Sequence, residues 1–198
     1  MNNYNLEMYR ILESLDKKPR ILLHTCCAPC STVCLEILSK YAFVTVIYYN
    51  PNIEPYEEYL KRKKEQIRLL SELNIKHMDI DYLNEEYRNK VVGYEKEPEN
   101  GARCHICYRL RLEKTAKLAK ENNFDYFATT LTVSPYKNDK VINEIGLNLQ
   151  NKYNIKYLLS DFKKEDGYKR SIELSKKYNL YRQDYCGCLF SKEKKVDE

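Results

Sequence analysis

The sequence has no segment of the kind that crosses a membrane or directs secretion. Its first 18 residues, MNNYNLEMYRILESLDKK, are polar and amphipathic, whereas a secretory signal has a charged stretch followed by an apolar one. No apolar run approaches the roughly 20 residues that span a bilayer. We therefore expect a cytoplasmic protein with no membrane partner.

Glycine is scarce, tryptophan is absent, and nothing in the sequence marks a division into parts. The 198 residues include 5 Gly and no Trp, and there is no Gly/Ser-rich linker, internal repeat or low-complexity tract. A chain of this length can bury a core of its own, so it does not need disulfide staples to fold. The sequence predicts one domain over residues 1–198 that ends in a cysteine-bearing tail at about 181–198.

Neither sign of charge dominates the composition. Lys and Arg number 34 against 29 Asp and Glu, which gives a net charge of +5. This mildly basic balance is compatible with an RNA partner, although many proteins that bind no nucleic acid share it. The candidate phosphate contacts are two basic runs and four arginines: 61–64, 163–170, Arg103, Arg111, Arg170 and Arg182.

Segments with strand character alternate with segments of helical periodicity along the whole chain. This alternation predicts an α/β fold with an open, largely parallel sheet and helices on both faces. In such folds ligands bind at the carboxyl ends of the strands. The expected strands cover 20–25, 43–49, 76–81, 125–132 and 155–160, and the expected helices cover 31–41, 55–73, 105–122, 140–153 and 168–178.

Against these absences stands an abundance of cysteine, with eight residues mostly in three clusters. Clustered cysteines in a reducing compartment indicate metal or redox chemistry. Cys26 and Cys27 are poor disulfide partners, because neighbouring Cα atoms lie about 3.8 Å apart and disulfides need roughly 4.4–6.8 Å. The CxxC spacings of Cys27 with Cys30 and of Cys104 with Cys107 let two sulfurs face one centre. The pattern predicts a thiolate metal site, either zinc or iron–sulfur.

The last cluster, YCGC, is of a different kind. Cys186 and Cys188 would close a very small ring, and Gly187 permits the tight backbone that this requires. A disulfide there would be strained and easily reduced, which suits a redox shuttle. Ligation of a second metal is the competing interpretation. Cys34 lies on the apolar side of an expected helix and is interpreted as an ordinary buried thiol.

Five blocks of the sequence together resemble the cobalamin-independent epoxyqueuosine reductases, the QueH family. These blocks are HTCCAPC (24–30), YYNPNIEPYEEYLKRK (48–64), RCHICYRLRLEKTA (103–116), TTLTVSPYKN (129–138) and YRQDYCGC (181–188). The resemblance implies a Rossmann-like fold related to adenine-nucleotide hydrolase-like domains. It also implies an oxidoreductase that deoxygenates epoxyqueuosine in the tRNA anticodon loop to queuosine, with an unidentified electron donor.

The resemblance implies site residues as well. It makes Cys26, Cys27, Cys104 and Cys107 the ligands of a [4Fe–4S] cluster, and Cys186 and Cys188 a redox-active pair that can form a disulfide. The family can hold a second, mononuclear iron beside the cluster. The candidate ligands for that iron are Cys30, one cysteine of YCGC and Asp81.

The residues are consistent with this chemistry, and two other functions remain as alternatives. Deoxygenation needs a proton donor, for which Asp81, Tyr136 and Lys137 are of a suitable type. One alternative is a cluster-dependent tRNA thiolase that uses ATP. Such enzymes hold pyrophosphate in a glycine-rich loop after the first strand, but HTCCAPCS has no glycine there. The other is a zinc-stabilised RNA-binding module, which would leave YCGC unexplained.

Overall fold

The computed structural model describes residues 3–193 and contains a five-stranded sheet. The strand order is β3-β2-β1-β4-β5, and every neighbouring pair is parallel. This confirms the expected fold class, and each strand lies within a predicted segment. The strands are β1 (Arg20–His24), β2 (Phe43–Ile47), β3 (Lys76–Met78), β4 (Tyr126–Thr129) and β5 (Lys156–Tyr157).

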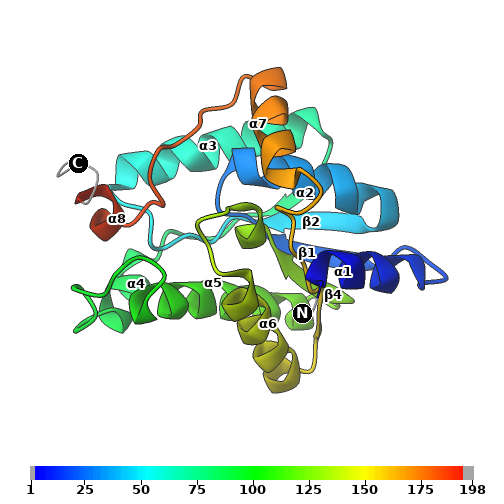
Figure 1. The fold of residues 1–198 in the computed structure, drawn as a ribbon, viewed down its shortest axis with the longest axis horizontal. Coiled ribbons are helices and arrows are strands. Elements are labelled where there is room, and N and C mark those ends of the chain that lie inside the picture. Colours follow the sequence, from blue (N-terminus) through cyan, green and yellow to red (C-terminus); the bar gives the residue numbers. More distant parts are fainter. Residues whose placement is uncertain (1–2, 194–198) are drawn as a thin grey trace.

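Helices cover both faces of the sheet, so the molecule has three layers (Figure 1). The helices of one face are α1 (Tyr4–Glu13), α2 (Ala28–Tyr41), α3 (Tyr56–Glu72) and α7 (Gly167–Lys177). Those of the other face are α4 (Asn84–Lys90), α5 (Ala102–Glu121) and α6 (Asp139–Tyr153). Within residues 3–193, no helix combines the length and apolar character needed to cross a bilayer.

The central strand is apolar on both faces because both faces are covered. Leu22 packs into the core beneath α5 and α6, while Ile21 and Leu23 pack into the core beneath α2 and α7. Successive side chains of a strand point to opposite faces, so a strand buried on both sides is a continuous apolar run. This is why RILLH forms β1.

The five expected helices are confirmed, and among residues 3–193 three further α-helices were not predicted. They are α1, α4 and α8 (Leu189–Glu193). The Asn3 side chain accepts a hydrogen bond from the Leu6 N–H and caps α1, and Met8 and Leu12 are buried. A 3₁₀-helix, η1 (Leu131–Val133), follows β4 where the strand was expected to continue to 132. The helix α8 lies within the predicted tail, and residues 194–198 of that tail lie outside the described part of the chain.

Candidate metal centre

The HTCCAPC segment lies where the strand order of the sheet reverses. From β1 the chain passes through α2 to β2 on one side, whereas β4 lies on the other side. The carboxyl ends of strands at such a switch point form the usual ligand site of open α/β sheets. The Cys26 N–H donates to Thr130 Oγ1 at 3.3 Å, and Thr130 directly follows β4. Cys26 therefore lies at the switch point itself.

A buried histidine joins the ends of the three central strands beneath this site. His24 Nδ1 lies 3.0 Å from Thr129 Oγ1, and its Nε2 lies 3.1 Å from the Tyr49 carbonyl oxygen. Burial, with the positive charge of Arg111, lowers the pKa of His24 to about 3. The ring is therefore neutral at pH 7, with Nε2 donating to the carbonyl. It serves as a fixed support for the cysteines that follow.

The first thiol group consists of Cys26, Cys27 and Cys30. Their sulfur atoms all lie within 4.8 Å of one another, and Cys26 Sγ is 3.9 Å from Cys27 Sγ. Cys27 is the N-cap of α2, and Pro29 lies in the first turn, where its fixed φ favours helix initiation. The abrupt change from strand to helix thus brings three sulfurs of one short segment to a common point.

The sulfurs of the first thiol group differ in acidity. Hydrogen bonds from Cys27 and Cys30, with the positive charges of Lys137 and Arg111, lower the pKa of Cys26 well below its usual value. The same contact with Cys26 raises the pKa of Cys27 to about 12. Cys26 is therefore the most acidic of the three thiols, and a metal ion would displace the remaining protons on binding.

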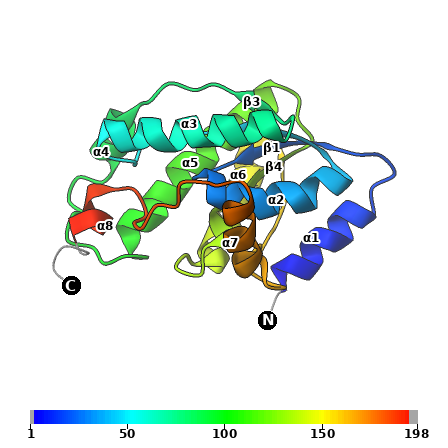
Figure 2. The ribbon, with the colours of Figure 1, turned by 90° about the horizontal axis from the view of Figure 1, so that it is seen from above.

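The second thiol group consists of Cys104 and Cys107 near the start of α5 and Cys186 and Cys188 on the tail. Figures 1 and 2 show the tail and α8 lying beside the start of α5. The guanidinium of Arg103 in α5 lies 4.4 Å from the centre of the Phe190 ring in α8. Burial, with the charges of Cys186 and Cys188 contributing, raises the pKa of Cys107 to about 12. The same causes raise the pKa of Cys104.

The tail is held mainly through its backbone. The Glu54 N–H donates to the Gly187 carbonyl oxygen at 2.8 Å, and Arg62 Nη1 donates to the Cys186 carbonyl oxygen at 3.2 Å. Gly187 has a φ of +129°, and a Cβ there would lie 2.9 Å from Ile53 Cγ1. The requirement for glycine between the two cysteines therefore has both a conformational and a steric cause.

Part of the first thiol group shares a core with the second thiol group. Cys26 and Cys104 both pack against the core cluster that contains Cys107 and Cys188, whereas Cys30 packs against the core of the opposite face. All eight cysteines are free thiols. Of the four cysteines expected to bind one cluster, Cys26, Cys104 and Cys107 thus belong to one core.

The three expected proton donors are placed differently. Asp81 follows β3 and is exposed, and its charge contributes to raising the pKa of Tyr59, which burial raises most. Tyr136 is 71% exposed. The pKa of Lys137 is raised because the negative charges of Cys186, Cys26 and Cys30 outweigh the effect of burial. Of the three, Lys137 is the one whose charge interacts with both thiol groups.

The arginines expected to contact RNA have structural partners. Arg103 and Arg111 are each 2% exposed, so the expectation that they reach phosphates is wrong in this structure. Within the basic run 61–64, Arg62 is equally buried and pairs with Glu58. The sequence could not distinguish these buried arginines from exposed ones, because the helical pattern around an arginine does not fix whether its side chain is buried.

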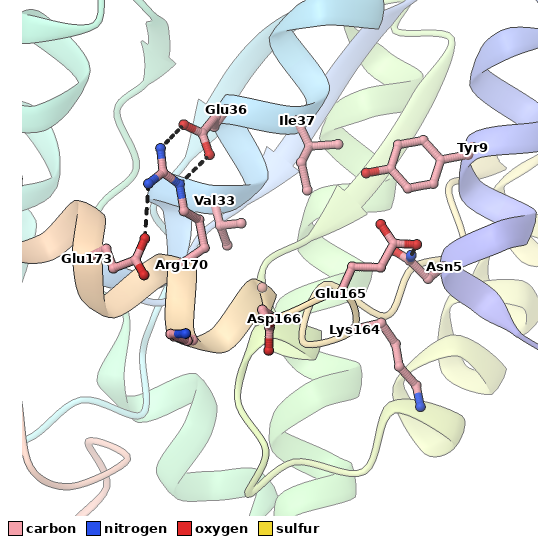
Figure 3. A pocket seen from close by; sticks show the side chains of 12 residues that line it. Asn5, Tyr9, Val33, Glu36, Ile37, Lys164, Glu165, Asp166, Arg170 and Glu173 are labelled. Carbon is pink, nitrogen blue, oxygen red and sulfur yellow. Dashed lines mark hydrogen bonds and ion pairs between the residues drawn. The ribbon is translucent and has the colours of Figure 1, made fainter.

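Arg170 lies at a pocket far from the cysteines in the fold. The pocket has a volume of about 350 Å³, lies between α1, α2 and α7, and has no cysteine in its lining. Figure 3 shows Arg170 there between Glu36 and Glu173. Arg182 in turn donates to Ser175 Oγ. The residues predicted to carry chemistry therefore do not line this pocket.

Solved structures share the fold of this chain. The U34-tRNA thiolase NcsA from Methanococcus maripaludis, solved with its [4Fe-4S] cluster, superimposes with a TM-score of 0.58 at 15% identity, covering 94% of this chain and 67% of that chain. NMN synthetase from Francisella tularensis gives a TM-score of 0.52 at 14% identity, covering 93% and 75%. At this identity the likeness concerns the fold, which is adenine-nucleotide hydrolase-like.

Sequence relatives cover nearly the whole chain. Epoxyqueuosine reductase QueH from Streptococcus pyogenes serotype M1 is 46% identical over 191 residues, covering 93% of this chain and 75% of that protein. The protein of the same name from Thermotoga maritima is 35% identical over 174 residues, covering 86% and 89%. The profile described as epoxyqueuosine reductase QueH matches residues 21–194. The chain therefore belongs to the QueH family of epoxyqueuosine reductases.

Proposed function

We propose that this protein reduces epoxyqueuosine to queuosine in tRNA. The observation that carries the proposal is that cysteines of HTCCAPC, RCHIC and YCGC belong to one core in a member of the QueH family. The substrate is tRNA with epoxyqueuosine in its anticodon loop, and the mildly basic net charge of +5 suits that partner. We place the enzyme in the cytoplasm and treat the chain as one domain.

The reaction needs two electrons and two protons. Both C–O bonds of the epoxide break, a C=C bond forms between the two carbons, and the oxygen leaves as water. Oxidation of a dithiol to a disulfide releases two electrons and two protons, so this exchange balances with Cys186 and Cys188 as reductant. An external donor of unidentified nature would then restore the dithiol.

We assign Cys26, Cys27, Cys104 and Cys107 as ligands of a [4Fe–4S] cluster, which takes four thiolates. The donor set fits, because these are soft sulfur ligands of which Cys26, Cys104 and Cys107 belong to one core, and the thiolase NcsA with its cluster has a similar fold. When bound, the cluster would supply single-electron transfer next to the substrate. Since the deoxygenation needs two electrons, a second redox or Lewis-acid centre completes the chemistry.

A second iron is the alternative to a disulfide between Cys186 and Cys188. Cys30 supports it, because this sulfur lies within 4.8 Å of those of Cys26 and Cys27 but is left over from the cluster ligands. One cysteine of YCGC and Asp81 would complete the set. Asp81 is supported by its position after β3, at the edge of the sheet where ligands bind.

Lys137 is the residue that we propose to act on the leaving oxygen. Its raised pKa keeps Nζ protonated, so it can donate a hydrogen bond to negative charge that develops on the oxygen. Asp81 and Tyr136 remain alternatives as proton donors. Lys137→Met should then lower kcat with little effect on the binding of modified tRNA.

An ATP-free assay tests the proposal against the thiolase alternative. Anaerobically purified protein should be brown and should absorb near 400 nm. With a chemical electron donor it should convert tRNA-bound epoxyqueuosine to queuosine without nucleotide, since HTCCAPCS lacks a glycine-rich phosphate loop. Colourless zinc protein would favour the RNA-binding module, and strict dependence on ATP would favour the thiolase.

A further inference from the structure

Arg111 is a positive charge buried inside the protein without a carboxylate partner. Its side chain is 2% exposed, and in the part of the chain that the structure describes no ion pair includes it. Its Nε donates to the Cys107 carbonyl oxygen at 3.2 Å, and its buried Nη2 has no hydrogen-bond partner. A buried charge without a counter-charge is strongly destabilising, so an anion should face Arg111 when the protein is at work.

The neighbours that act on the charge of Arg111 are cysteines from both thiol groups. Burial acts to lower the pKa of Arg111, but negative charge on Cys107, Cys186 and Cys26 outweighs it and raises the pKa. Lys137 lies in the same field, because Cys186 and Cys26 raise its pKa as well. Two positive side chains therefore face sulfur atoms where carboxylates would otherwise be expected.

The neighbouring groups that can supply this negative charge are cysteine thiols. Metal binding deprotonates thiols outright. The counter-charge that Arg111 lacks is thus the one that a thiolate-held metal centre would bring.

The other large buried arginines have more partners for the ends of their side chains. Arg62 Nε lies 2.6 Å from Glu58 Oε1 in an ion pair. Arg103 has no ion pair among the described residues and its Nε lacks a partner, but its terminal Nη1 donates to the carbonyl oxygens of Tyr94 and Glu95 at 3.1 and 2.6 Å. Arg111 is singled out by a terminal nitrogen without a partner and by the thiols of both groups that act on its charge.

We infer that Arg111 is the buried counter-charge of the metal centre and sets its reduction potential, with Lys137 adding to the same field. The inference rests on the proposed function only in requiring that the thiols hold an iron–sulfur centre. Net charge and hydrogen bonds to sulfur are among the factors that tune such potentials. A fixed positive charge favours the reduced state, which carries one more electron, and so raises the potential.

The first test compares Arg111→Met with Arg109→Gln, which removes a charge from an exposed position of the same helix. Both variants and the wild type are loaded anaerobically with iron and sulfide, and the midpoint potential is measured by an EPR-monitored titration. At a fixed potential we expect R111M to lower the ratio of reduced to oxidised cluster about tenfold, equivalent to ~59 mV for a one-electron couple. R109Q should match the wild type.

The outcomes separate this inference from the proposed function. Equal potentials in R111M and R109Q would overturn the inference while leaving the reductase proposal intact. A wild type that takes up no iron and sulfide would instead contradict the proposed function. Arg111→Lys keeps the charge and should retain a potential near that of the wild type, and a drop as large as that of R111M would also count against the inference.

A second measurement needs no metal. Methionine fills similar space without charge, so R111M should raise the urea midpoint of the metal-free protein while reducing the stability gained on loading. A purely structural arginine would show the opposite sign in the metal-free protein. A lower metal-free midpoint for R111M would make Arg111 a packing residue and overturn the inference.

Discussion

The two thiol groups are assembled by different routes. The first thiol group comes from one segment of five residues, in which a strand end and a helix start fix all three sulfurs. The second thiol group joins α5 to a tail that follows it by about 80 residues of sequence, and the tail is held by hydrogen bonds to Glu54 and Arg62. Local backbone geometry builds one group, and tertiary docking builds the other.

It follows that only the second thiol group depends on the docking of segments distant in the sequence. Cys26, Cys27 and Cys30 would stay close together in any conformation that keeps β1 and the start of α2. Cys186 and Cys188 would leave Cys104 and Cys107 as soon as the tail detached. A centre that spans both groups therefore reports whether the tail is docked.

The largest expected effect comes from removing one ligand from either group. Cys26→Ala and Cys104→Ala should each remove most of the cluster iron and all activity, because a [4Fe–4S] cluster needs four thiolates. Iron and sulfide analysis after reconstitution measures this, with Cys34→Ala as the control. Cys34 is fully buried in the opposite core, so that variant should keep its iron and lose about 1 kcal/mol of stability.

Retention of full iron by Cys104→Ala would contradict a centre that spans both thiol groups. The centre would then belong to the first thiol group alone, and the second group would have to be reassigned as redox thiols.

Substituting the tail cysteines should separate electron delivery from cluster binding. Cys186→Ser and Cys188→Ser should abolish conversion of epoxide to alkene, because a serine hydroxyl cannot form a disulfide, while absorbance near 400 nm persists. Single-turnover assays on modified tRNA measure the chemistry directly. Loss of the cluster in either variant would make that cysteine a ligand, and normal turnover would make the pair bystanders.

A substitution at Gly187 tests the docking of the tail without changing any cysteine. Gly187→Ala should destabilise the protein by about 1–3 kcal/mol through backbone strain and displace the tail, because the new Cβ would lie 2.9 Å from Ile53 Cγ1. Activity should fall at least tenfold while most iron remains. Gly93→Ala is the matched control, since Gly93 also has a positive φ but nothing lies within 4 Å. Equal activity of the two variants would show that tail placement does not limit turnover.

The smallest effect is expected at the pocket of Figure 3, which neither thiol group touches. Hydrogen bonds from Arg170 lower the pKa of Glu36 below its usual 4.5. A lowered pKa in the folded state stabilises the protein above pH 4.5 and ceases to do so as the pH falls through the folded value. Glu36→Gln should therefore lower the urea midpoint slightly at pH 7, by an amount that shrinks as the pH falls below 4.5, with activity unchanged.

Local patterns predicted the elements of this fold well. Apolar runs such as RILLH gave the central strands, since a strand buried on both faces has no polar positions to obscure it. The edge strands β3 and β5 are short and partly exposed, and they were recognised from their place in the alternation of strands and helices. Their spatial order did not follow from the sequence, because the pairing of β1 with β4 joins segments about a hundred residues apart. The helix α8 was missed because five residues carry too little periodicity to recognise.

The candidate site was predictable in its residue types but not in its grouping. The CxxC spacings indicated metal chemistry, yet the close contact of Cys30 with Cys26 and Cys27 depends on Cys27 being the N-cap of α2. Arg111 was interpreted as a possible RNA contact. Its burial, its terminal nitrogen without a partner and its thiol neighbours distinguish it, and none of these properties is written in the sequence around it.

The docked tail also sets an order of events during synthesis. Every strand, and every helix except α8, precedes Cys186 in the chain, and domains made on the ribosome begin to fold from their N-terminal parts. The sheet, Cys26 and Cys104 can thus be in place while the YCGC segment is still inside the ribosome. During that interval the cysteines at the start of α5 lack the YCGC segment beside them, so we expect iron and sulfide to reach them before the tail docks.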